Sequence, residues 1–141
     1  MKYLFWLILS FLFASANIYR DSSKDIVIDD KARLMWIDDI SVVKIRKDHQ
    51  TAIKYCEELT YAGFNNWRLA KAEEFELIVD KSNTKNYINR AFKYNVPDGY
   101  WASKALWRTL WFYADYMHFI SGTPYYDSRH KNKYVRCVRE Y

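Results

Sequence analysis

The sequence predicts an α+β domain, in which helices and strands occupy separate stretches of the chain. Three observations predict it. Short runs of β-like composition lie near both ends, two runs with helical spacing lie between them, and a chain of 141 residues has room for one domain. Aromatic residues make up 19% of the chain, enough for a dense core. The expected order is an N-terminal hairpin, two helices, and an antiparallel sheet closed by the C-terminal strand.

The first sixteen residues predict an export signal rather than part of the fold. Lys2 precedes an apolar run, and Ala14-Ser15-Ala16 offers the small residues that signal peptidase recognises. The apolar run is short for a stable bilayer span; a retained N-terminal anchor is the alternative. We therefore expect a signal peptide over 1–16, a loose lead-in over 17–24 and the domain over 25–141.

The first elements of the domain follow from local patterns. Residues 25–29 and 33–37 predict two strands of a hairpin, because a turn signal, Asp29-Asp30-Lys31, lies between them. Apolar residues at i, i+3, i+4 and i+7 predict a helix over about 50–59 with Asp48 as its N-cap.

Later elements are predicted in the same way. A second helix is expected over 72–80, with two glutamates near its positively polarised start. Mostly loop is expected over 81–98. Strands are expected over 100–103, 109–113, 116–120 and 133–139.

Cys56 and Cys137 are the two cysteines of the sequence. An exported chain reaches an oxidising compartment, which favours a disulfide between them. A redox or metal-binding pair is the alternative, but such pairs favour close spacing such as Cys-x-x-Cys. Cys56 falls on the apolar face of the predicted first helix, where a structural bridge fits.

The charges and the histidines argue against several functions. The net charge of +5 is small for a dedicated nucleic-acid binder. His49, His118 and His130 do not have the spacing of metal ligands, and the sequence contains no nucleophile elbow. We therefore expect no catalytic residues, no metal, no other cofactor, no nucleic-acid partner and no membrane span once the signal is removed.

Two segments of the C-terminal half combine aromatic rings with cations. Aromatic faces stack on sugars, and Arg or Lys heads hold sulfate or carboxylate groups. A solvated basic loop beside core aromatics is the alternative interpretation. The candidate ligand-binding residues, all expected in loops, are Trp107, Arg108, Tyr126, Arg129, Lys131 and Lys133.

Several strings of the chain together resemble the Lcl C-terminal domain family. The resemblance covers residues 25–139, although the chain lacks the family's Thr-Gly before Leu34 and its Pro after Leu69. The matching strings are Leu34-Met35-Trp36, Ala52-Ile53-Lys54-Tyr55-Cys56, Ala62-Gly63-Phe64-Asn65-Asn66-Trp67-Arg68-Leu69, Tyr100-Trp101-Ala102-Ser103 and Val135-Arg136-Cys137-Val138-Arg139.

The resemblance implies a fold similar to that of C-type lectins and of the formylglycine-generating enzyme. In lectin-like folds a disulfide ties the first helix to the last strand, and Cys56 and Cys137 lie in those predicted elements. The expected function is that of a bacterial lectin-like binding domain, periplasmic or secreted, whose partner is an anionic polysaccharide or an envelope protein. A protein-interaction module of the cell envelope and a degenerate enzyme of the formylglycine-generating type are the alternatives.

Overall fold

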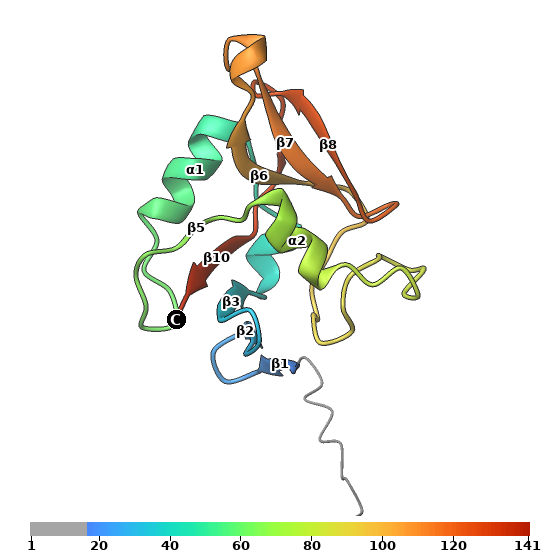
Figure 1. Ribbon diagram of the computed structural model, residues 1–141. Helices are drawn as coiled ribbons and strands as arrows, with labels where there is room; N and C mark the ends of the chain where they lie inside the picture. The colour runs from blue at the N-terminus through green and yellow to red at the C-terminus, as the bar shows by residue number, and fades with distance from the viewer. Residues whose placement is uncertain (1–16) are drawn as a thin grey trace, which may run out of the picture.

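The computed structural model describes residues 17–141, so the predicted signal segment lies outside the described residues. Two α-helices and two mostly antiparallel sheets form the domain (Figure 1), which confirms the α+β class. The elements are β1 (Ile18–Asp21), β2 (Ile26–Asp29), β3 (Leu34–Ile37), the 3-10 helix η1 (Ile40–Val43), β4 (Arg46–Lys47), α1 (His49–Glu57), β5 (Arg68–Leu69), α2 (Ala72–Ile78), β6 (Gly99–Ala105), the 3-10 helix η2 (Trp107–Thr109), β7 (Tyr113–His118), β8 (Thr123–Ser128), β9 (Lys133–Tyr134) and β10 (Cys137–Glu140).

The first sheet has the strand order β1-β2-β3-β10-β5, and every neighbouring pair in it is antiparallel. Residues 17–24 are not the loose lead-in that their polarity predicted, because β1 lies within them and pairs with β2 from Ile18 to Asp21. Pairing satisfies the backbone groups at the outer edge of β2. Arg20 of β1 also donates from Nε to the Asp38 carboxylate at 2.6 Å, which fixes the added strand.

The second sheet has the order β4-β9-β6-β7-β8. Its β6–β9 pair is parallel and its other pairs are antiparallel. The predicted strand over 109–113 is wrong, since this stretch holds the end of η2 and a turn before β7. Leu110 and Trp111 have φ values of 54° and 60°, which a strand cannot accommodate.

The predicted strand over 133–139 is two strands, one in each sheet. The C-terminal strand β10 therefore lies in the first sheet, between β3 and β5, and does not close the later one. Arg136, at the crossover, is fully buried and donates to the Ile37 carbonyl at 2.7 Å and to the Asp38 carboxylate at 3.3 Å. A buried guanidinium needs these partners, and satisfying them directs the chain from one sheet to the other.

Both helices start as their sequences predict. The Asp48 carboxylate accepts a hydrogen bond from the Thr51 amide at 2.9 Å, which caps α1. Before α2, Arg68 holds both carboxylate oxygens of Glu74, at 2.6 and 2.8 Å. Burial alone would raise the pKa of Glu74, but the hydrogen bonds from Arg68 and the Lys71 amide hold it below its usual range. Arg68 is therefore a structural residue.

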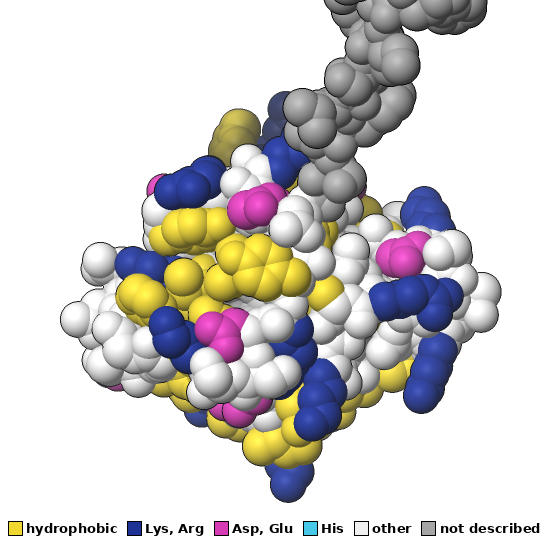
Figure 2. All heavy atoms as spheres, turned by 90° about the horizontal axis from the view of Figure 1, so that it is seen from below, with side chains coloured by type: hydrophobic (Ala, Val, Ile, Leu, Met, Phe, Trp, Pro, Cys, Tyr) yellow, Lys and Arg dark blue, Asp and Glu magenta, His cyan; other side chains and the backbone are white. Residues whose placement is uncertain are grey.

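The core lies between the sheets and the helices. Trp36, Trp67 and Trp101, the three tryptophans in the family strings, are fully buried. Seen from the β1 end, cations and carboxylates are interspersed among apolar patches (Figure 2). No helix within residues 17–141 is long and apolar enough to cross a membrane.

Candidate binding surface

The predicted disulfide is present and ties α1 to β10. Cys56 and Cys137 are bonded, with their Cα atoms 5.6 Å apart. Neither thiol is free within the described part of the chain. The redox alternative therefore has no thiol available there in the oxidised protein.

The six predicted site residues lie in three neighbouring places. Trp107 and Arg108 lie on η2, Tyr126 lies on β8, and the other three, Arg129, Lys131 and Lys133, lie in the turn after β8 and in β9. The structure brings the turn after β8 against residues 111–112, which follow η2. The Arg129 amide donates to the Phe112 carbonyl at 2.9 Å, and its guanidinium to the Trp111 carbonyl at 3.3 Å. The predicted loop location of Tyr126 is wrong, because this residue lies in β8, the outermost strand of the second sheet.

Two of the predicted cations share one carboxylate. Asp127 lies 3.2 Å from the Lys131 ammonium and 3.0 Å from that of Lys133. Burial alone would raise the pKa of Asp127, but the hydrogen bond from Lys133 keeps it below its usual range. The Lys133 side chain is only 13% exposed, and its Nζ lies 3.8 Å from the centre of the Tyr116 ring. Lys133 is thus a packed residue, whereas Lys131 remains accessible.

Arg129 is held by a buried histidine that the sequence did not reveal. The Arg129 Nε donates to His49 Nδ1 at 2.9 Å, while His49 Nε2 lies 2.8 Å from the Ala102 carbonyl. This arrangement requires a neutral ring with its proton on Nε2. Burial, followed by the charge of Arg129, lowers the pKa of His49, which agrees with a neutral ring. His49 therefore orients Arg129 from beneath the surface.

Exposed tyrosines line both faces of the β7–β8 ribbon. Tyr125 lies opposite Tyr116, and Tyr126 lies opposite Asp115, so the two tyrosines of β8 face opposite sides. The Tyr125 and Tyr126 side chains are 49% and 65% exposed. Their ring centres lie 6.1 Å from those of Tyr116 and Tyr113, respectively. These contacts hold the rings in place while leaving much of their surface open.

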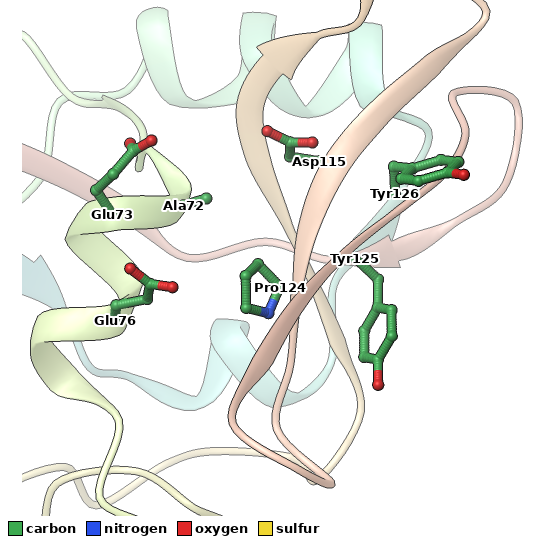
Figure 3. Close-up of a pocket in the computed structure, with 7 residues that line it drawn as sticks. All are labelled: Ala72, Glu73, Glu76, Asp115, Pro124, Tyr125 and Tyr126. Atoms are coloured by element: carbon green, nitrogen blue, oxygen red, sulfur yellow. The ribbon is translucent and has the colours of Figure 1, made fainter.

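An acidic groove of about 280 Å³ separates α2 from this ribbon. Figure 3 shows Glu73 and Glu76 of α2 across from Asp115 and Pro124, while the rings of Tyr125 and Tyr126 point away from α2. Burial raises the pKa of Asp115; the charge of Lys104 opposes this rise, and that of Glu73 adds to it. Carboxylates accept hydrogen bonds from hydroxyl and ammonium groups, and they repel anions.

Sequence reasoning did not identify this groove. Its carboxylates come from a helix and from a strand of the second sheet, and no local pattern relates Glu73 to Asp115. No cluster of three or more side chains suited to metal binding occurs within residues 17–141.

Comparisons with known proteins agree with the strings found in the sequence. The model of the Lcl C-terminal domain matches residues 25–139. No curated protein matches the chain.

Proposed function

Because this chain belongs to the Lcl C-terminal domain family over residues 25–139, we propose that it is an exported, lectin-like domain that binds a polysaccharide and catalyses no reaction. One observation carries the proposal: Tyr125 and Tyr126 present open rings on opposite sides of β8, the outermost strand of a sheet, and the same strand borders a groove lined with carboxylates. Rings and hydrogen-bond acceptors in this combination suit the two faces of a sugar, one apolar and one rich in hydroxyls.

Export is supported by two features. The predicted signal segment precedes the domain, and the disulfide between Cys56 and Cys137 forms most readily in an oxidising compartment. A periplasmic or secreted location follows from the same reasoning.

The charges favour one class of polysaccharide at the groove. Glu73, Glu76 and Asp115 line it, so a sulfated or carboxylated chain would be repelled there. Neutral sugars, or sugars bearing an ammonium group, fit better. The anionic chain expected from the sequence would lie instead over Arg129 and Lys131, although Lys131 already shares Asp127 with Lys133.

A glycan array bearing neutral, amino and sulfated chains tests the proposal. The protein is used with its disulfide intact, and the variant is Tyr125→Ala with Tyr126→Ala. We expect wild type to bind neutral or amino chains and the double variant to bind at least about tenfold more weakly, because it lacks both stacking surfaces. Tyr19→Ala is the matched control, since Tyr19 is 43% exposed but lies on β1.

Three outcomes contradict the proposal. Wild type binds no glycan, the double variant binds as well as wild type, or Tyr19→Ala loses as much affinity as the double variant. Capture of an envelope protein without glycan binding would favour the interaction-module alternative.

Lys131→Ala tests the anionic chain separately on heparin. Lys131 is the suitable residue because its side chain is 65% exposed, so its removal leaves the fold intact. Removing Arg129 and Lys133 as well would also break contacts with His49 and Asp127. If Lys131→Ala elutes from a heparin column at the same salt concentration as wild type, Lys131 does not contribute to an anionic-chain site.

A further inference from the structure

The loop between β6 and β7, residues 106–112, forms an exposed apolar tip. It projects at the end of the molecule opposite β1 (Figure 1). Leu110, its most exposed large apolar residue, is 73% exposed, and three aromatic side chains beside it are also more than half exposed. Those aromatic residues are Trp107, Trp111 and Phe112. Monomeric proteins rarely leave such a contiguous apolar group in water unless it contacts something.

The backbone of this tip is fixed by its own hydrogen bonds. The Leu106 carbonyl accepts from the Trp111 amide at 3.1 Å and from the Thr109 hydroxyl at 2.7 Å, and the Leu110 amide donates to the Trp107 carbonyl at 2.9 Å. The tip is therefore preformed.

The same backbone is strained at two adjacent positions. Leu110 and Trp111 both have left-handed φ values, where glycine or asparagine is the favoured residue. Large apolar side chains at such positions need a reason other than local stability.

The charges around the tip are positive. Between Gly99 and Ala114 the sequence contains Lys104 and Arg108 and no acidic residue. On the other flank, Arg129 and His130 line a cleft of about 370 Å³ together with Leu110, Trp111 and Phe112. The one carboxylate in this cleft belongs to Asp48, which is engaged in capping α1.

We propose that the tip inserts into the interface of a lipid bilayer that carries anionic headgroups. Trp, Phe and Leu at the apex would enter the boundary between headgroups and acyl chains. Lys104 and Arg108 would then lie at the level of the lipid phosphates. A membrane is favoured over a protein partner because the apolar group is convex and protruding, which suits a deformable partner, and because cations surround it.

This inference does not rest on the proposed glycan site. The glycan contacts assigned above lie on α2, β7 and β8, whereas the membrane contacts lie on the tip. The domain could therefore hold a polysaccharide close to a membrane surface. The two proposals can fail separately, because glycan binding and vesicle binding are measured in different assays with different variants.

Co-sedimentation with vesicles tests the insertion. The vesicles contain phosphatidylcholine with or without one quarter phosphatidylglycerol, and the variant is Leu110→Asn with Trp111→Asn. Asparagine tolerates left-handed φ, so the variant is expected to fold. We expect wild type to bind the anionic vesicles with a blue shift of tryptophan emission, and the variant to bind at least tenfold more weakly.

Ile120→Asn is the matched control, because Ile120 is 58% exposed but lies outside the tip. It should bind vesicles as wild type does, and Arg108→Ala should weaken binding only to the anionic vesicles. The proposal is overturned if wild type ignores anionic vesicles, if it binds neutral vesicles equally well, or if the tip variant binds unchanged. Tip-dependent self-association or protein capture without vesicle binding would assign the tip to a protein contact instead.

Discussion

Replacing His49 with Phe should destabilise the domain while keeping most of the packing. The imidazole is fully buried against the Trp101 ring, with ring centres 5.0 Å apart, and a phenyl ring can occupy a similar volume. The phenyl ring cannot accept from Arg129 Nε or donate to the Ala102 carbonyl. Each buried polar group left without a partner costs about 1–3 kcal/mol. We expect a total loss of roughly 2–4 kcal/mol, since water can reach the Arg129 side chain more easily than the carbonyl.

The same residue makes stability depend on pH. An unfolded chain protonates histidine near pH 6.5, but burial and Arg129 hold the pKa of His49 lower in the folded protein. Below about pH 6.5 the unfolded state therefore binds a proton that the folded state does not. His49 thus contributes stability that is fully present above that pH and is lost as the pH falls, by up to about 1.4 kcal/mol per pH unit.

Urea unfolding at pH 7.5 and pH 5.5 measures both effects. The difference between wild type and His49→Phe should be larger at pH 7.5 than at pH 5.5, because the variant has no proton to bind at this position. His49→Gln is the matched variant, since its amide can donate to the Ala102 carbonyl and accept from Arg129. An unchanged stability in His49→Phe, or a difference independent of pH, would refute the reasoning about a neutral, doubly bonded ring.

Two further predictions concern a turn and the disulfide. Gly122→Ala should destabilise the protein far more than Gly63→Ala in thermal unfolding. Both glycines have positive φ, but an added Cβ at Gly122 would lie 2.6 Å from Val79 Cγ1, whereas one at Gly63 would meet nothing within 4 Å. Equal losses of stability would show that backbone strain alone decides the effect. Intact-mass measurement after alkylation should detect no reactive thiol until reductant is added. Replacing Cys56 and Cys137 by Ala should lower the free energy of unfolding by roughly 4.5 kcal/mol, from the entropy of closing the loop between them. Two reactive thiols in the native protein would contradict the disulfide.

Local patterns in the sequence predicted much of the fold. The spacing of apolar residues located α1, and the Asp48 cap is present where the sequence placed it. The cysteine pair was also predicted, because compartment chemistry does not depend on topology. The strand β1 was missed because only two of its four residues, Ile18 and Tyr19, are apolar, and because its stability comes from pairing with β2.

The candidate surface depended on contacts between distant residues, which one sequence does not show. Arg129 and His49 are separated by 80 positions, so the pair is invisible to any local pattern. Asp127 is the one acidic residue between Thr123 and Lys133, but its contacts with Lys131 and Lys133 depend on the turn after β8. Trp111 and Phe112 of the tip were predicted as part of a strand, and left-handed backbone at Leu110 gave no sequence signal.

The proposed polysaccharide site extends across β8 and the groove beside α2. The most direct test titrates ¹⁵N-labelled protein with an oligosaccharide fragment of the glycan bound most tightly on the array, and follows the amide signals by NMR. We expect the amide signals of Tyr125, Tyr126 and Glu73 to shift together, with one saturable dependence on oligosaccharide concentration. Shifts confined to β1–β3, or no shifts with any neutral or amino glycan, would contradict it.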